Sequence, residues 1–149
     1  MDQYGVVGHP VSQSWSPFIH GLFARQTDQA LTYRLYDIAP AQFRGEVLEF
    51  FAHGGRGLNV TVPHKEAAAD LANELSARAE RAGAVNTLML QGDHHLIGDN
   101  TDGAGLVRDL ERNLRVPVAD RRILILGAGG AARGVLGPLL ELQPAELVL

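Results

Sequence analysis

The chain has 149 residues, with no cysteine, a single lysine and no long apolar run. Without cysteine it can form neither a disulfide framework nor a thiolate metal site, and this composition fits the reducing cytoplasm, where we expect the protein to reside. No stretch approaches the roughly 18 apolar residues that cross a bilayer. Residues 1–10 lack the basic and apolar regions of a secretory signal. We therefore expect no membrane association.

Basic clusters and metal-ligand patterns are also missing. The formal net charge is -4, and no Lys/Arg run or basic face is present, so we expect no nucleic-acid partner. Among the six histidines, His94 and His95 are adjacent and point apart, and no carboxylates accompany them at ligand spacing, so we expect no metal site. Hydrophobic residues make up 46% of the chain, which indicates a folded globular protein rather than a disordered one.

Short strands alternate with helices along the chain, and this order predicts an α/β protein with a mainly parallel sheet. Strands are predicted over residues 4–8, 31–38, 57–63 and 145–149. Two further strands are joined by a turn at Gly92-Asp93, and the strand at 122–126 is expected to be buried on both faces. Helices are predicted over residues 64–72 and 127–142, and a short helix is predicted after Ser76. Another helix begins at Ser16 as its N-cap, and one more carries Phe43, Val47, Leu48 and Phe51 on one side. A helix that begins at Asp102 carries Leu106, Val107, Leu110 and Leu114.

This pattern divides the chain into two units. We expect residues 1–103 to form a three-layer α/β/α domain, and residues 104–149 to form a connector helix and an incomplete Rossmann-type dinucleotide-binding domain. One strand–helix–strand unit cannot bury both faces of its strands. We therefore expect the sequence to be a fragment of a longer protein, the alternative being a short chain whose last strand pairs with a neighbour.

A glycine-rich turn directly follows the apolar strand at 122–126. In the sequence GAGGAA, Gly127 permits a tight turn, Gly129 lets a pyrophosphate approach the backbone, and Ala132 lets the helix pack on the strand. The N–H groups at the start of that helix favour an anion. The pattern indicates a dinucleotide site, with a ligand-free turn as the alternative. The residues present do not distinguish NAD from NADP.

The segment NVTVPHK places polar residues at the end of a predicted strand. Alternation puts Asn59 and Thr61 on one face, and Val60 and Val62 on the other. Lys65 is the only lysine beside twelve arginines, and its amine can release a proton whereas guanidinium cannot. Since ligands gather at the carboxyl ends of strands in open α/β sheets, these residues indicate a binding site, with a capped strand and a solvated lysine as the alternative.

Two further polar clusters could face the same place. Asn86 offers a donor and an acceptor that suit a polyol, and Asp102 could hold both a lysine and a hydroxyl, or simply cap a helix. Ser14 and Ser16 precede a helix, where hydroxyls could hold a carboxylate. Ordinary loop and cap serines are the alternative.

The segments GHPVSQSWSP, NVTVPHK, AVNT, GDNTDGAG and LGAGGAARG resemble, in order and spacing, the shikimate dehydrogenase family. This resemblance covers essentially the whole chain. It implies an NADP-dependent oxidoreductase acting on a CH–OH group, which reduces 3-dehydroshikimate to shikimate with NADPH in aromatic amino-acid biosynthesis. The alternatives are a quinate dehydrogenase and a non-catalytic module that binds a hydroxylated ring acid.

The resemblance also implies a role for each matching residue. Lys65 matches the catalytic lysine and Asp102 its carboxylate partner, while Ser14 and Ser16 match the serines that hold the substrate carboxylate. The family residues that surround the ring hydroxyls correspond to Asn59, Thr61, Asn86 and Asp102 of this chain. The family's cofactor turn corresponds to Gly127, Ala128, Gly129, Gly130 and Ala131. Other family residues that select NADP and complete the pocket have no counterpart here, so we expect little activity from this fragment alone. Oligomeric state stays open, with a homodimer as one alternative.

Overall fold

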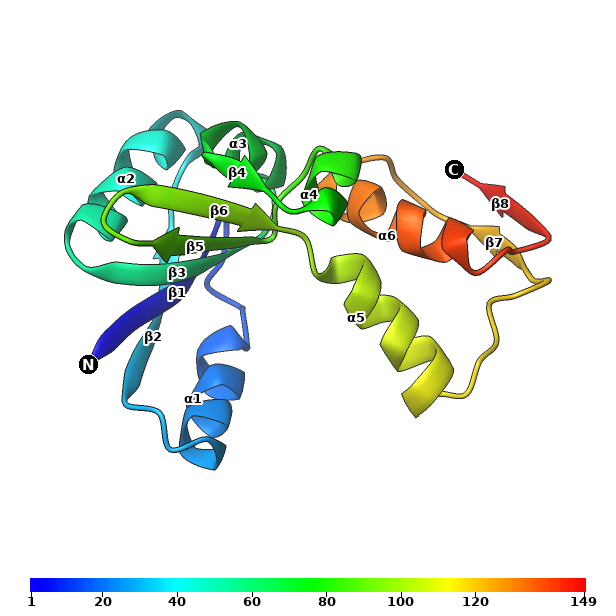
Figure 1. Ribbon diagram of the computed structural model, residues 1–149, viewed down its shortest axis with the longest axis horizontal. Helices are drawn as coiled ribbons and strands as arrows, with labels where there is room; N and C mark the ends of the chain where they lie inside the picture. The colour runs from blue at the N-terminus through cyan, green and yellow to red at the C-terminus, as the bar shows by residue number, and fades with distance from the viewer.

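The computed structural model describes all 149 residues and contains two separate sheets (Figure 1). The larger sheet has six strands in the order β2-β1-β3-β5-β6-β4. β1 pairs in parallel with β2 and β3, β4 pairs in parallel with β6, and β5 is antiparallel to both its neighbours. The strands are β1 (Asp2–Gly8), β2 (Leu31–Asp37), β3 (Gly55–Val60), β4 (Glu74–Leu75), β5 (Thr87–Gln91) and β6 (His95–Asp99). The predicted α/β class with a mainly parallel sheet is confirmed.

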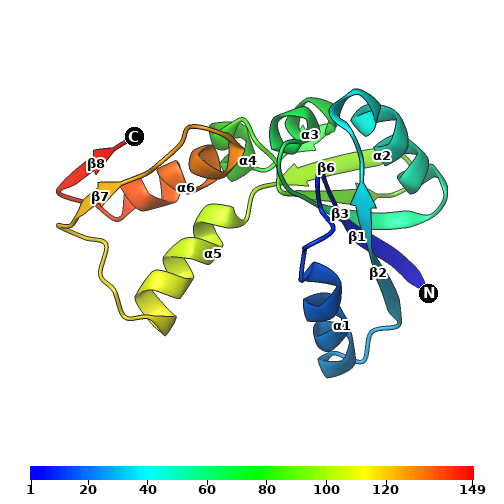
Figure 2. The same ribbon diagram turned by 180° about the vertical axis from the view of Figure 1, so that it is seen from behind.

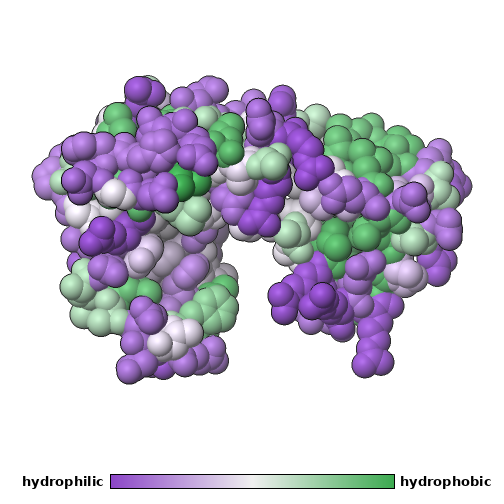
Figure 3. All heavy atoms as spheres, in the orientation of Figure 1, coloured by the Kyte–Doolittle hydropathy of each residue, from purple (hydrophilic) through white to green (hydrophobic).

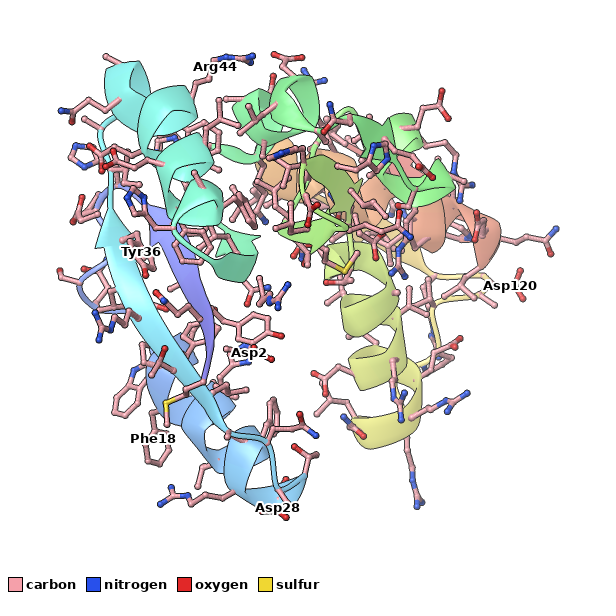
Figure 4. The ribbon with its side chains drawn as sticks, turned by 60° about the vertical axis from the view of Figure 1, so that its left-hand side comes forward. Asp2, Phe18, Asp28, Tyr36, Arg44 and Asp120 are labelled. Atoms are coloured by element: carbon pink, nitrogen blue, oxygen red, sulfur yellow. The ribbon has the colours of Figure 1, made fainter.

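Helices cover the two faces of this sheet unequally. A 3-10 turn (Pro40–Gln42) leads into α2 (Phe43–Ala52), which lies with α3 (Lys65–Leu71) over one face, whereas α1 (Ser16–Gln26) lies on the opposite side (Figure 1). The main core is between the sheet and α2 and α3, because most of its buried side chains come from these elements, among them Val7, Val47, Leu58 and Leu88. α1 buries no residue completely, and Phe18 points outward from it into open space (Figure 4).

The elements that follow β6 form a second lobe. α4 (Ala77–Ala82) leads back into the large sheet, and α5 (Asp102–Arg108) continues through a π-helical turn (Asp109–Asn113). A parallel pair, β7 (Arg122–Leu124) and β8 (Glu146–Val148), flanks α6 (Gly130–Glu141), which packs against α4 and α5 (Figure 2). The two lobes meet along one side and leave an open notch on the other (Figure 3). None of the helices is both long and apolar enough to cross a bilayer.

Three local expectations in the first lobe are wrong. Ser16 is not the N-cap of α1, because the helix begins at Ser16 and Trp15 holds the cap position. Val62 is 62% exposed, because β3 ends at Val60 and the alternation of faces stops with the strand. Leu48 is 42% exposed, because only Phe43, Val47 and Phe51 of α2 face the sheet.

The second lobe is less buried than its sequence indicates. The helix predicted from Asp102 ends as α5 at Arg108, and Leu114 is exposed beyond the π-helical turn. β7 is only three residues long and Leu124 is 65% exposed, so this strand is not buried on both faces. β7 has one neighbouring strand, β8, and therefore too little surrounding structure to cover it. The two-residue strand β4 was too short to predict from periodicity.

Candidate active site

An ion pair joins the first residues of two helices at one end of the large sheet. Lys65 opens α3 after β3, and Asp102 opens α5 after β6. The Lys65 Nζ donates a hydrogen bond of 2.5 Å to Asp102 Oδ2, and the two side chains are 11% and 26% exposed. A cation in the first turn of a helix is unfavourable because the dipole is positive there, and the negative charge of Asp102 offsets this effect on Lys65. The amine is therefore held in one place instead of moving in solvent.

Backbone and side-chain contacts hold the Asp102 carboxylate in turn. Asn86 Nδ2 donates to Asp102 Oδ1 and to Thr101 Oγ1, both at 2.8 Å. Asn86 Oδ1 accepts from the Thr101 N–H at 2.9 Å, so the amide is oriented from both ends. The Asp102 N–H donates to Oδ1 of Asn100, a side chain that is almost wholly buried. With one oxygen held by Asn86, the other is directed at Lys65.

A row of neutral polar groups continues from Asn86 across the sheet. Thr87 Oγ1 donates to Asn86 Oδ1 at 3.0 Å, and Asn59 Nδ2 donates to Thr87 Oγ1 at 3.4 Å. The Tyr33 hydroxyl donates to Asn59 Oδ1 at 2.7 Å. This row places hydrogen-bonding groups of three strands along one surface, an arrangement suited to a ligand with several hydroxyl groups.

Burial keeps the aromatic end of this row uncharged. The Tyr33 ring stacks on His20, with ring centroids 4.1 Å apart and planes 8° from parallel. Burial raises the pKa of Tyr33, and burial lowers the pKa of His20 against a smaller opposing effect of its hydrogen bond with Asn59. Both groups are therefore neutral at pH 7. The only charges on the whole row are those of the Lys65–Asp102 pair.

Ser14 and Ser16 lie together beside the end of β1. Ser14 Oγ donates to Ser16 Oγ at 3.0 Å, and the Ser16 N–H donates to Ser14 Oγ at 3.2 Å. With Thr61 they line a hollow of about 220 Å³ whose wall carries no charged side chain. Asn59 instead lines a separate, larger hollow of about 600 Å³ with His20, Tyr33 and Thr87. The predicted polar residues thus lie in neighbouring hollows of one lobe.

The glycine turn faces Lys65 from the second lobe. Gly127 has a φ of 111°, which only glycine adopts easily, and a Cβ on Gly129 would meet nothing within 4 Å. No side chain caps the start of α6, so its first N–H groups are free for an anion. Residues of the turn and Lys65 line one hollow of about 310 Å³. This geometry fits the phosphates of a dinucleotide, although Ala128 does not line the hollow.

The structure brings most of the predicted site residues together. Lys65, Asp102, Asn86 and Asn59 share one hydrogen-bonded row, and the glycine turn lies across from Lys65. Tyr33 was not predicted as a site residue, because an aromatic residue is ordinary in an alternating strand and only the packing of the strands brings it to Asn59. Asn100 and Thr101 belong to the polar segment GDNTDGAG, but nothing local in the sequence indicated which atoms their hydrogen bonds would reach.

The fold and the site define an α/β protein in which a Lys–Asp pair lies beyond the carboxyl ends of two sheet strands, and its lysine faces a dinucleotide-type glycine turn. The sequence model for the shikimate dehydrogenase substrate-binding domain matches residues 6–88. The chain therefore belongs to the shikimate dehydrogenase substrate-binding domain family, and the resemblance inferred from its motifs is confirmed.

Individual relatives agree with this assignment. A shikimate dehydrogenase (NADP(+)) of Aeromonas salmonicida is 60% identical over all 149 residues, which cover 54% of that relative. The crystal structure of shikimate dehydrogenase 1 from Peptoclostridium difficile matches 99% of this chain and 54% of its own, with a TM-score of 0.93 and 32% identity. The Thermus thermophilus shikimate 5-dehydrogenase in complex with shikimate matches 99% and 56%, with a TM-score of 0.90 and 34% identity. The chain thus spans about half the length of these relatives.

Proposed function

We propose that this chain supplies the substrate-binding and proton-transferring half of an NADP-dependent shikimate dehydrogenase, which reduces 3-dehydroshikimate to shikimate. The observation that carries the proposal is the Lys65–Asp102 pair, held at 2.5 Å, in which Lys65 lines a hollow together with the glycine turn. The names of the relatives support the substrate and the cofactor. Residues 1–103 form the substrate-binding unit in this proposal, and residues 104–149 begin the cofactor-binding unit.

Reduction of a ketone adds a hydride to the carbonyl carbon and a proton to its oxygen. The Lys65 ammonium hydrogen-bonds the carbonyl oxygen, stabilises the negative charge that develops there and donates the proton. Asp102 aims the amine and balances its charge, and Asn86 keeps the carboxylate in the orientation that serves Lys65. In the reverse direction Lys65 accepts the proton of the hydroxyl group. NADPH supplies the hydride when bound.

The neutral polar groups account for the rest of the substrate. Asn59, Thr61 and Asn86, together with Asp102, bind the ring hydroxyls through amide, hydroxyl and carboxylate groups that can each meet a C–OH. The substrate carboxylate is held by Ser14 and Ser16, which already lie within 3.0 Å of each other. Hydroxyl donors at a helix start can hold a carboxylate without a formal positive charge.

In this proposal the glycine turn would hold the phosphates of the cofactor. The residues that would hold them are Gly127, Gly129, Gly130 and Ala131, which line the hollow, whereas Ala128 belongs to the turn without lining it. Free N–H groups at the start of α6 supply the hydrogen bonds, and the left-handed backbone of Gly127 makes the sharp entry into the turn. Lys65 lines the same hollow, so the proton donor and the cofactor turn share one wall.

A chimera tests this proposal, in which these 149 residues replace the matching part of the Aeromonas salmonicida relative. We expect NADPH consumption with 3-dehydroshikimate, measured by the loss of NADPH absorbance. Lys65→Met should lower kcat by about 10² to 10⁴-fold, the range of general acid catalysis. Its Kd for shikimate should change little. Lys65→Arg keeps a cation but not a proton that can leave, so it should lose activity too.

The control is Arg81→Gln, because the Arg81–Glu141 ion pair is exposed and neither residue lines the hollows described above. Wild-type kcat in the Lys65→Met chimera would refute the assignment of the proton donor. Tight shikimate binding with no turnover in the unmutated chimera would favour a binding module. A higher kcat/KM for quinate than for shikimate would favour a quinate dehydrogenase.

A further inference from the structure

Two glycines of α6 pack directly against the residues that build the ion pair. Gly130 and Gly134 are four residues apart and so lie on one face of the helix. A Cβ added to Gly130 would lie 2.9 Å from Lys65 Cβ and 3.4 Å from Lys65 Cδ. Distances below 3.0 Å between such atoms require one of them to move. The bare backbone of Gly130 is thus the surface on which the Lys65 stem rests.

Gly134 makes the corresponding contact on the Asp102 side. A Cβ there would lie 2.8 Å from Asn100 Oδ1 and 2.9 Å from its Nδ2. Asn100 is 2% exposed, accepts from the Asp102 N–H, and donates to the Ala84 carbonyl at 2.9 Å. Its amide therefore cannot yield to a methyl group without breaking a bond that holds Asp102.

The need for glycine at these two positions does not come from backbone conformation. Gly127 has a left-handed φ, whereas Gly130 and Gly134 have ordinary helical positions that any residue could adopt. Gly129 and Gly137 have open space where a Cβ would stand. Glycine at 130 and 134 is required by space alone, and the atoms that occupy this space belong to Lys65 and Asn100.

We propose that Gly130 is a positioning residue for the Lys65 amine, and that Gly134 positions Asp102 through Asn100, so that α6 of the cofactor-side lobe sets the geometry of the proton-transfer pair. This inference rests on the proposed function, in which that pair transfers the proton. It adds that Gly130 acts on the substrate side of the site as well as in the cofactor turn.

The single lysine of the chain makes a direct test possible without substrate or cofactor. With lysine labelled by ¹⁵N and ¹³C, NMR spectra of the 149-residue protein contain one side-chain ammonium, that of Lys65. Reductive methylation with ¹³C-formaldehyde modifies only this amine and the α-amino group of Met1, a residue that is 83% exposed and serves as an internal reference. Both readouts report the surroundings of Lys65 and are independent of catalysis.

Gly130→Ala should shift the Lys65 Nζ signal and raise its methylation rate relative to Met1 by about tenfold, which corresponds to 1.4 kcal/mol. Gly134→Ala should shift the same signal by displacing Asp102. Gly137→Ala is the matched control on the same helix and should leave signal and rate unchanged. An unchanged Lys65 signal in Gly130→Ala, or an equal shift in Gly137→Ala, would overturn the inference.

A folding defect is distinguishable from a local one. If Gly130→Ala does not fold by circular dichroism, the double variant Lys65→Gly/Gly130→Ala removes the side chain that the new Cβ meets. Recovered folding supports the contact, and failure to recover refutes it. Since no ligand is present, these outcomes are independent of shikimate binding and turnover, and the proposed function can fail separately.

Discussion

Replacing Asp99 by asparagine should destabilise the protein more at neutral pH than in acid. Asp99 ends β6 and accepts from Arg78 Nε at 2.7 Å, from Arg78 Nη2 at 2.5 Å and from Ser76 Oγ at 2.6 Å. These bonds hold the start of α4 against the end of β6, directly before Asn100. Asp99→Asn keeps the size of the side chain but removes the charge and one of the two accepting oxygens, so it tests the ionised carboxylate as the partner of Arg78.

The Arg78 guanidinium, helped by Ser76 and the Asn100 N–H, lowers the pKa of Asp99 from 3.8 to about 2, against the opposing effect of burial. At 1.36 kcal/mol per pKa unit, this difference corresponds to about 2 kcal/mol of unfolding free energy. Because the folded pKa is below the unfolded one, the contribution is complete above the unfolded pKa near 4. It is lost as the pH falls through the folded pKa near 2.

Urea unfolding followed by circular dichroism at pH 7 and at pH 2 measures this contribution. We expect Asp99→Asn to lower the unfolding free energy by about 2 kcal/mol at pH 7, and we expect the difference from wild type to shrink at pH 2. Glu141→Gln is the control, because its ion pair with Arg81 is about 60% exposed on both sides and contributes less than about 1 kcal/mol. A loss of equal size at both pH values, or none at pH 7, would refute the electrostatic reasoning.

Three other changes have defined outcomes. Leu88→Ala should lower the unfolding free energy by about 2–5 kcal/mol because Leu88 is fully buried, whereas Leu48→Ala on the exposed side of α2 should change it little in the same urea titration. Asn86→Ala should weaken shikimate binding about tenfold by calorimetry, because it removes an amide proposed to bind a ring hydroxyl and the hydrogen bond that orients Asp102. Asn113→Ala, whose side chain donates to Asp109, should leave the Kd unchanged. Ser14→Ala should raise the Kd of shikimate more than that of an analogue without the carboxylate, and equal effects on both ligands would contradict the proposed carboxylate site.

Much of the architecture could be predicted because its signals are local. Pro17, Ser76 and Gly92 mark helix starts and a turn, and alternation and apolar runs located most of the strands in the structure. Burial was harder to predict. Leu48 and Leu124 are as apolar as core residues, but their exposure depends on how many neighbouring elements cover them, which periodicity along the chain does not contain.

The candidate site shows the same division. The α/β order, the glycine turn, the lone lysine and the polar residue types at the strand ends could all be read from the sequence, because they depend on local backbone preferences and side-chain chemistry. Three contacts depend on the folded chain: Lys65 meets Asp102 across 37 positions of sequence, β3 and β5 bring Asn59 opposite Thr87, and Gly130 lies against the lysine. Such contacts arise from strand pairing and helix packing, which join residues distant in the chain that carry no local mark of their partners.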